Sequence, residues 1–531
     1  MRERVIGLET EYAISATDRK GERASRTLAL ESLLRRAKRN LAFLPGGSSS
    51  GMFLSSGARL YPDAGAHPEL ATPECPGGPA ELLRYAIAGD RMLGRLAVEE
   101  CQRSRRLSEI VLARTNVDYL TGATFGSHEN YAHALDPSML WRRILPHLVS
   151  RIVFTGAGGL DVLADGVGFV LSPRVSFLER DSSSSSTTDR GIHHSKNEPL
   201  GRSGLHRLHV ICGESTCSRL AGYLRFGTTA LVVALSEAGL LPSRVRLAQA
   251  LPSMREIARD PSCRVQVALQ RGGASTAIRI QRRYLELAER HRRADFMPSW
   301  AGDVCDRWRE TLDLLEHGPD AVATRLDWAI KRVLVRRHVA RRGFDEERLR
   351  RWTPILEKLG LALSLSVHPS PVISVEEILS PDGPVADGVR VLEPDLRDAG
   401  LGWEELRPLV DLRKELCELD LRYARVGPDG LYETLARSGV LDDGVDGIGD
   451  VEEAMTVPPP RGRARLRGEA IRALAGRRDC CADWHFVRDD RGRMLDLSDP
   501  LAATAEWRDP DRRDAMRLML DLGEDLLPTP S

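Results

Sequence analysis

Residues Ser56 to Glu74 read S-G-A-R-L-Y-P-D-A-G-A-H-P-E-L-A-T-P-E, and the rest of the chain can be arranged around this stretch. If residues 58–63 form a β-strand, successive side chains point to opposite faces of it. The polar face then carries Arg59, Tyr61 and Asp63. The other face carries Ala58, Leu60 and Pro62 and is apolar, so this strand is predicted to present reactive groups on one side only.

A second acidic strand is predicted near the amino terminus, within residues 5–14. Glu9 and Glu11 lie two residues apart and therefore share a face, opposite the side chains of Ile6, Leu8 and Thr10. Two carboxylates on one face repel each other and resist burial unless a cation lies between them, which favours a hard metal ion. A solvated edge strand with scattered acids fits the same spacing.

Two later segments bring further polar groups. A strand over Glu109 to Arg114 leads into a Gly-rich turn at 122–126, which delivers His128, Glu129 and Asn130. A strand over residues 207–211 places Arg207 and His209 on one face.

Size, charge and cysteine usage limit the class of protein. A chain of 531 residues exceeds what one core supports, so a large domain with a smaller one is expected. Its 76 basic and 76 acidic residues balance, which gives no reason to expect nucleic-acid or membrane binding. The chain opens without a targeting signal and its nine cysteines form no C-x-x-C pair, so a reduced, cytoplasmic protein is expected.

Three segments resemble the family of Pup ligases and Pup deamidases/depupylases. They are I-G-L-E-T-E-Y at 6–12, G-A-R-L-Y-P-D-A-G-A-H-P-E at 57–69 and G-S-H-E-N-Y at 126–131. Shorter similar segments follow in the same order at 207–211, 226–232, 327–332, 463–469 and 483–484. The resemblance thus runs along residues 1–500, and such colinearity is more specific than any single motif.

The resemblance implies a fold and a domain plan. The fold is α+β: a glutamine-synthetase-like cradle of curved antiparallel β-sheet with packed helices, plus a small carboxy-terminal α+β domain. We expect a catalytic domain at 1–455, with a surface insertion at 339–411 where the chain departs from the family. We expect the small domain at 461–525 and a flexible tail at 526–531.

The resemblance also implies roles for site residues. Glu9, Tyr61 and Glu69 would bind Mg²⁺, and Asp63 would accept a proton. Arg59, Thr72 and Trp484 would contact ATP, with Arg207 as a further contact. Second-rank metal ligands are Glu11, Glu74, His128 and His209. A carboxylate-rich set of this kind suits Mg²⁺ or Mn²⁺.

The implied activity is an ATP- and Mg²⁺-dependent ligation. It would join the side-chain carboxylate of the C-terminal glutamate of a small, disordered Pup-like modifier to a lysine of a protein substrate, through an acyl phosphate. The deamidase/depupylase branch carries a long extra loop between residues corresponding to 14 and 53, and this interval is short here, which favours the ligase branch.

Two alternatives stay open. In a family segment that matches residues 190–199, Lys196 stands where the family has arginine and Asn197 where it has aspartate, which keeps a hydrolase of the same family possible. An inactive nucleotide-binding scaffold is the other alternative, although its site would have no need of clustered acids.

Overall fold

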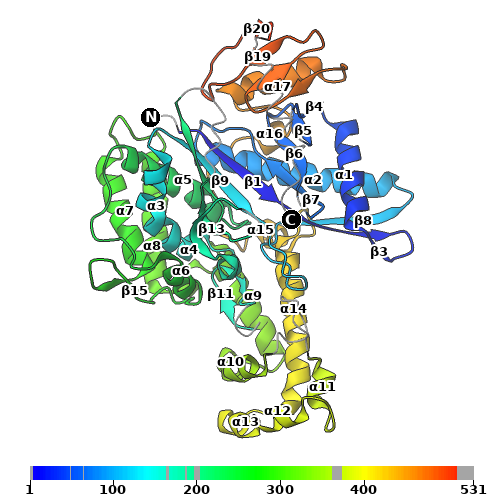
Figure 1. Cartoon of the computed structure of the whole chain (residues 1–531), viewed down its shortest axis with the longest axis vertical. Coiled ribbons are helices and arrows are strands. Elements are labelled where there is room, and N and C mark those ends of the chain that lie inside the picture. Colours follow the sequence, from blue (N-terminus) through cyan, green and yellow to red (C-terminus); the bar gives the residue numbers. More distant parts are fainter. Residues whose placement is uncertain are drawn as a thin grey trace.

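The computed structural model describes residues 4–47, 50–63, 65–162, 167–185, 188–195, 204–360 and 373–510. Its centre is a nine-stranded sheet in the order β12-β13-β14-β9-β1-β7-β6-β5-β4 (Figure 1). Its strands are β1 (Ile6–Glu11), β4 (Phe43–Pro45), β5 (Met52–Leu54), β6 (Arg59–Asp63), β7 (His67–Ala71), β9 (Ser127–His133), β12 (Arg180–Ser183), β13 (Gly191–His194) and β14 (His206–Val210). Neighbours are antiparallel except β12 and β13, which run parallel at one edge. The predicted α+β class is confirmed, and the parallel edge pair departs from an all-antiparallel sheet.

The register of the central strands decides which side chains meet. Residues paired across an antiparallel ladder point to the same face. The pairs that matter are Glu9 with His128, Glu11 with Glu69, Tyr61 with Glu69, Asp63 with His67, and His209 with Asn130. Every predicted metal ligand except Glu74 therefore lies on one face of five adjacent strands.

The opposite face of the sheet is apolar and is covered by helices. Leu8 and Leu208 on this face belong to the largest hydrophobic core, together with Leu83 and Leu224 of the helices. Helices α2 (Pro79–Arg103), α3 (Pro137–Ser150) and α5 (Arg219–Glu237) contact the strands of the sheet, and α7 (Ala277–His291) and α8 (Ala301–His317) pack on these helices as a further layer. Helix α5 is buried over nearly its whole length because it is apolar on all sides after Arg225.

A second, smaller layer flanks the amino-terminal strands. It contains the sheet β3-β2-β8 and helix α1, which begins where the Ser25 hydroxyl accepts the N–H of Leu28. Their bounds are β2 (Ala13–Asp18), β3 (Arg23–Ala24), β8 (Leu107–Ala113) and α1 (Arg26–Asn40). The remaining short elements are α4 (Ile152–Thr155), β10 (Gly159–Leu160), β11 (Phe169–Val170), η1 (Pro173–Phe177), α6 (Ala250–Ala258), β15 (Val267–Ala268), β16 (Ala274–Ser275), η2 (Pro319–Val322), α15 (Leu431–Arg437) and α16 (Val451–Ala454).

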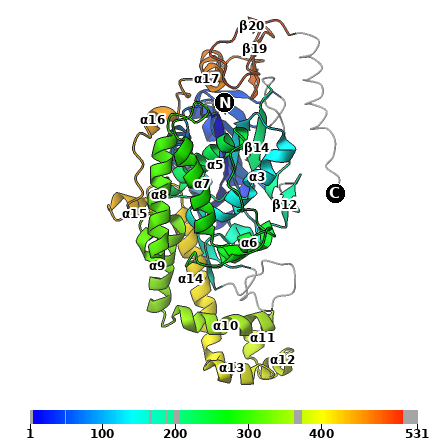
Figure 2. The ribbon, with the colours of Figure 1, turned by 90° about the vertical axis from the view of Figure 1, so that its left-hand side faces the viewer.

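A helical extension projects from the main body, at the bottom of Figures 1 and 2. It comprises α9 (Asp327–Arg341), α10 (Glu346–Leu359), α11 (Val375–Leu379), α12 (Ala386–Arg390), α13 (Glu393–Ala399), η3 (Trp403–Glu405) and α14 (Leu406–Ala424). Trp352 and Leu409 are buried in its core, which also takes in Tyr119 and Leu160 of the main body. The predicted insertion at 339–411 falls within this extension, and its exact limits remain a prediction.

The carboxy-terminal part packs on the β4–β5 end of the large sheet, at the top of Figure 1. It consists of helix α17 (Arg463–Leu474) and the sheet of β17 (Cys481–Ala482), β18 (Phe486–Arg488), β19 (Met494–Asp496) and β20 (Trp507–Arg508). The predicted boundary before residue 461 remains a prediction, and the tail at 526–531 lies outside the described residues. Within the described ranges, no helix combines the length and apolarity needed to cross a lipid bilayer.

Candidate active site

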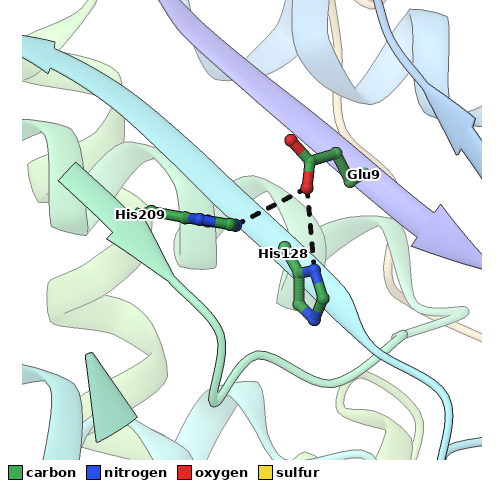
Figure 3. Close-up of side chains that lie close together, drawn as sticks. All are labelled: Glu9, His128 and His209. Carbon is green, nitrogen blue, oxygen red and sulfur yellow. Dashed lines mark ion pairs between the residues drawn. The ribbon is translucent and has the colours of Figure 1, made fainter. Parts of the chain in front are cut away.

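Glu9 lies between two histidines on neighbouring strands (Figure 3). Its Oε2 is 3.6 Å from His128 Nδ1 and 3.5 Å from His209 Nε2. Burial acts to raise the pKa of Glu9, but the two histidines and Arg207 outweigh it and hold that pKa well below the usual value. The three side chains come from β1, β9 and β14, so the sheet itself brings them together.

Glu11 forms the next part of the cluster, and Gly126 makes room for it. Glu11 Oε1 is 3.7 Å from His128 Nε2, and its Oε2 accepts the Gly126 N–H at 2.7 Å. A Cβ at Gly126 would lie 2.2 Å from His128 Nε2 and 2.9 Å from Glu11 Oε1. A residue larger than glycine would therefore push these two side chains apart.

Glu69 is the acid that the protein does not neutralise. Burial raises its pKa well above the usual value, and the Glu9 and Glu11 carboxylates raise it further. Tyr61 is paired with Glu69 across the β6–β7 ladder, and burial together with the nearby Glu69 and Glu9 raises the tyrosine pKa. Three acids and a tyrosine are thus crowded where a cation would relieve their repulsion.

The donor atoms in this cluster fit a divalent cation. Three sets of side chains each offer ligand atoms within 4.8 Å of one another. They are Glu9, His128 and His209; Glu11, Glu69 and His128; and Glu11, Asp63 and His67. Carboxylates are the majority in the second and third sets, as Mg²⁺ prefers, while the first set has two imidazoles, which are also acceptable to Mn²⁺.

Asp63 borders the cluster and is paired with His67. The distance from Asp63 Oδ2 to His67 Nε2 is 3.2 Å, and Glu11 Oε2 is 3.7 Å from the same nitrogen. Burial lowers the pKa of His67, but Asp63 and Glu11 prevail and raise it to about 9. The Asp63 side chain is 34% exposed, so a substrate group can reach it.

The predicted nucleotide contacts lie in three places. Arg59 stacks over Tyr61 at 4.2 Å, and Phe53 contacts both Arg59, at 5.7 Å, and the edge of Trp484, at 5.2 Å. Arg207 lies on the other side of the cluster, 3.7 Å from Glu9 Oε1. Thr72 is buried, and its hydroxyl accepts the Leu8 N–H at 3.1 Å, so it also ties the end of β7 to β1.

Two acids of the predicted segments face elsewhere. Glu74 forms ion pairs with Arg463, at 2.6 Å, and with Arg467, and these arginines lower its pKa to about 2 against the opposing effect of burial. Glu129 points to the covered face of the sheet and pairs with Arg151 at 2.6 Å. Both carboxylates already have strong partners, so the second-rank assignment of Glu74 to the metal cluster is wrong. Lys196 and Asn197 lie outside the described residues.

Two residues of the site were missed from the sequence. His67 stood in the opening segment, and pairing 58–63 with 67–71 as a hairpin would have placed it opposite Asp63. Arg174, in η1, is 3% exposed, and its Nε and Nη1 make no hydrogen bond to the described residues. It lies near enough to Glu11 to lower that carboxylate's pKa. No signal in the sequence around Arg174 pointed to the cluster.

Comparisons with known proteins identify the family of this chain. The family model of the Pup-ligase protein matches residues 4–362 and 391–488, leaving out only 363–390 of the predicted insertion between these two blocks. A Pup–protein ligase of Brachybacterium faecium is 37% identical over 379 residues, covering 68% of this chain and 76% of the relative. A Pup–protein ligase of Acidimicrobium ferrooxidans is 30% identical over 514 residues, covering 95% and 97%.

Solved structures share the fold over almost the whole chain. The ligase PafA, in the crystal structure of its complex with the prokaryotic ubiquitin-like protein Pup, superposes with a TM-score of 0.70 at 24% identity, covering 99% of this chain and 96% of PafA. PafA in complex with ADP gives a TM-score of 0.65 at 24% identity, covering 93% of each chain. The predicted fold is therefore confirmed. With a family model matched over most of its length, this chain belongs to the Pup ligase family.

Proposed function

We propose that this protein is an ATP-dependent ligase. It joins the side-chain carboxylate of the C-terminal glutamate of a Pup-like modifier to lysine amines of protein substrates. The observation that carries the proposal is the crowd of acids around Glu69, placed beside a half-exposed aspartate on one face of the sheet. Relatives named Pup–protein ligase, and the PafA structures with Pup and with ADP, support the same activity.

The acid cluster would hold the divalent metal. Glu9, Tyr61 and Glu69 are the proposed ligands, with Glu11, His128 and His209 completing the set. A bound Mg²⁺ or Mn²⁺ would neutralise phosphate charge during phosphoryl transfer. The raised pKa of Glu69 supports this role, because it marks a carboxylate whose neighbours disfavour its charge.

Positive and aromatic groups on either side of the cluster would hold ATP. Arg207, next to Glu9, suits the phosphates, and Arg59, beside Phe53 and Trp484, suits the base or ribose. Thr72 would contribute through its hydroxyl hydrogen, since its oxygen already accepts the Leu8 N–H. The carboxylate of the modifier attacks the γ-phosphorus, ADP departs, and an acyl phosphate is left.

Asp63 would act as the base of the second step. A lysine amine is protonated at neutral pH and must lose a proton before it attacks the acyl carbon and expels phosphate. Asp63 is the partly exposed carboxylate at the edge of the cluster, and the positive charge that His67 carries at neutral pH keeps the Asp63 side chain oriented. Proximity of the three reactants on one face would supply much of the rate.

The cytoplasm is the compartment we propose. All nine cysteines are free thiols, most of them buried, which suits a reducing environment.

Incubation with ATP, Mg²⁺, a modifier ending in Gly-Gly-Glu and a lysine-bearing protein tests the proposal. Ligation predicts ADP release that requires the modifier, and a conjugate visible as a mass shift of the acceptor. Release of ammonia from a modifier ending in Gly-Gly-Gln, or cleavage of a conjugate, without net ADP formation would assign the protein to the hydrolase alternative. Nucleotide binding without either reaction would assign the protein to the alternative of an inactive nucleotide-binding scaffold.

A further inference from the structure

A cavity lies on the helical side of the molecule, away from the acid cluster. Its volume is ≈ 670 Å³, within the range of small-molecule sites. It is bounded by α3, by α7, by the loop 241–246 after α5 and by the tip of the β15–β16 hairpin. The strands that carry the acid cluster contribute nothing to its lining.

The charge of this cavity is strongly positive. Four arginines line it: Arg143, Arg244, Arg246 and Arg271. The lining includes no aspartate or glutamate, and within the described part of the chain no guanidinium of the four forms an ion pair. Elsewhere, the exposed Arg336 pairs with Glu346 and the half-buried Arg325 pairs with Glu310. Four unpaired cations around one hollow repel each other, and a bound anion would relieve that repulsion.

The arginines are held on a fixed frame. The Gln270 N–H donates to the Arg246 carbonyl at 2.9 Å, and the Ala248 N–H donates to the Ala268 carbonyl at 3.0 Å, which ties the loop to the hairpin. Arg244 has a φ of 64°, a left-handed conformation that a residue with a long side chain seldom adopts. Backbone strain of this kind tends to occur where a side chain must be aimed at a ligand.

The walls between the arginines are apolar. Leu241, Pro242 and Leu269 line the cavity, and the buried Tyr284 closes one side. Planar guanidinium groups bind phosphate in a bidentate fork, and apolar walls accommodate an organic group. A hollow of this volume also suits a compact ligand better than a nucleic-acid strand, which binds along an extended groove.

We propose that this cavity binds a small anion with two or more phosphate groups, at a site distinct from the catalytic one. The binding contributes a second phosphate-recognition function, independent of the ligase activity proposed above.

Calorimetric titration of the full-length protein with inorganic tripolyphosphate tests the site. The measurement is made at physiological salt with Mg-ADP present to fill the catalytic site. We expect one saturable site whose affinity falls at least tenfold in the variant R244Q/R246Q/R271Q. The matched control is R26Q/R35Q/R39Q, which removes three exposed arginines from α1 and should bind as the unmodified protein does. Equal binding by all three proteins would overturn the proposal.

Three further arms make the outcome specific. The single variant Arg271→Gln, at the exposed hairpin tip, replaces the triple variant if the latter unfolds, and weaker binding of tripolyphosphate by it supports the site. Citrate that binds more tightly than tripolyphosphate would contradict the assignment to phosphate. A single-stranded oligonucleotide that binds through the same arginines, when tripolyphosphate does not bind, would replace the small-anion site with a nucleic-acid surface.

Discussion

Glu69 and Glu74 are five residues apart in the chain, and the fold gives them opposite environments. Glu69 lies among other acids, and its pKa is raised by burial and by the carboxylates around it. Glu74 lies between Arg463 and Arg467, and its pKa falls to about 2. One acid is left without a countercharge inside the protein, and the other is fully neutralised.

The difference separates a binding site from a structural joint. A buried acid without a countercharge costs free energy in the empty protein, and a ligand that brings positive charge recovers that cost. A buried acid with two arginines needs no ligand and instead holds two parts of the chain together. Residue type alone does not distinguish the two cases, but the identity of the partners does.

Asp63→Asn should have the largest effect on the functional side of this contrast. Loss of the proposed base is expected to lower the rate of conjugation by about 10²–10⁴-fold, while ADP binding stays nearly unchanged. Conjugation is followed on gels and nucleotide binding by calorimetry. Asp446→Asn, at a fully exposed aspartate, is the matched control and should conjugate normally. Normal conjugation by the Asp63 variant would remove this residue from the role.

Glu74→Gln should have the largest effect on the structural side. It leaves Arg463 and Arg467 buried without a countercharge, and breaking a buried pair in this way costs about 3–5 kcal/mol. The free energy of unfolding, from denaturant titration, checks this value. Glu452→Gln, which removes the ion pairs with Arg91 and Arg95 at a 46%-exposed side chain, should change stability by no more than about 1 kcal/mol. Equal losses of stability in the two variants would contradict the stabilising role of the Glu74 ion pairs.

The Glu74 joint should also weaken in acid. Its folded pKa of about 2 lies below the ordinary value of 4.5, so the stabilisation is complete above pH 4.5 and is lost as the pH falls towards 2. The difference in unfolding free energy between the unmodified protein and Glu74→Gln should therefore shrink across this window. A constant difference from pH 6 to pH 3 would show that the charge of Glu74 is not the cause.

Glu9→Ala should weaken Mg²⁺-dependent nucleotide binding. Removal of residues that support metal ligands lowers metal affinity by about 10–100-fold, and loss of a direct ligand should lower it by at least as much. Titration with ATP at fixed Mg²⁺, compared with titration in EDTA, isolates the metal-dependent part. Unchanged affinity would refute the assignment of Glu9 to the metal.

Glu69→Gln should have the smallest effect, and it should have the opposite sign to Glu74→Gln. Without metal, the change removes like-charge repulsion and should raise the free energy of unfolding by about 0.5–2 kcal/mol. Added Mg²⁺ should stabilise the unmodified protein more than the variant. Thermal unfolding with and without Mg²⁺ measures both effects. If the metal-free variant were less stable than the unmodified protein, the idea that Glu69 is repelled by the neighbouring acids would be contradicted.

Much of this site was predictable because strand alternation is a local property. The alternation at 6–11 and 59–63 correctly assigned Glu9, Glu11, Tyr61 and Asp63 to polar faces. The partners of Glu74 were not predictable, because Arg463 and Arg467 lie 389 and 393 residues further along the chain. Arg174 reaches the cluster through a loop and short helix whose path no local pattern specifies.

The helical extension was only partly predictable. The departure from the family at 339–411 predicted a surface insertion there, and Figures 1 and 2 show a helical extension that projects from the main body. The limits of the insertion remain a prediction. The long α14 that supports the extension was not recognised. The apolar side chains of α14 pack partly against the other helices of the extension rather than against the largest hydrophobic core.

The contact between Arg467 and Trp484 carries a consequence for how the protein can be divided. Arg467 forms an ion pair with Glu74, which follows strand β7, and its guanidinium also stacks on Trp484 at 4.9 Å. Trp484 in turn packs against Phe53 of β5. A truncated chain that stops before residue 461 would leave Glu74 and Phe53 uncovered together. The polypeptides before and after residue 461 should therefore associate when they are produced separately, and each should be unstable when it is produced alone.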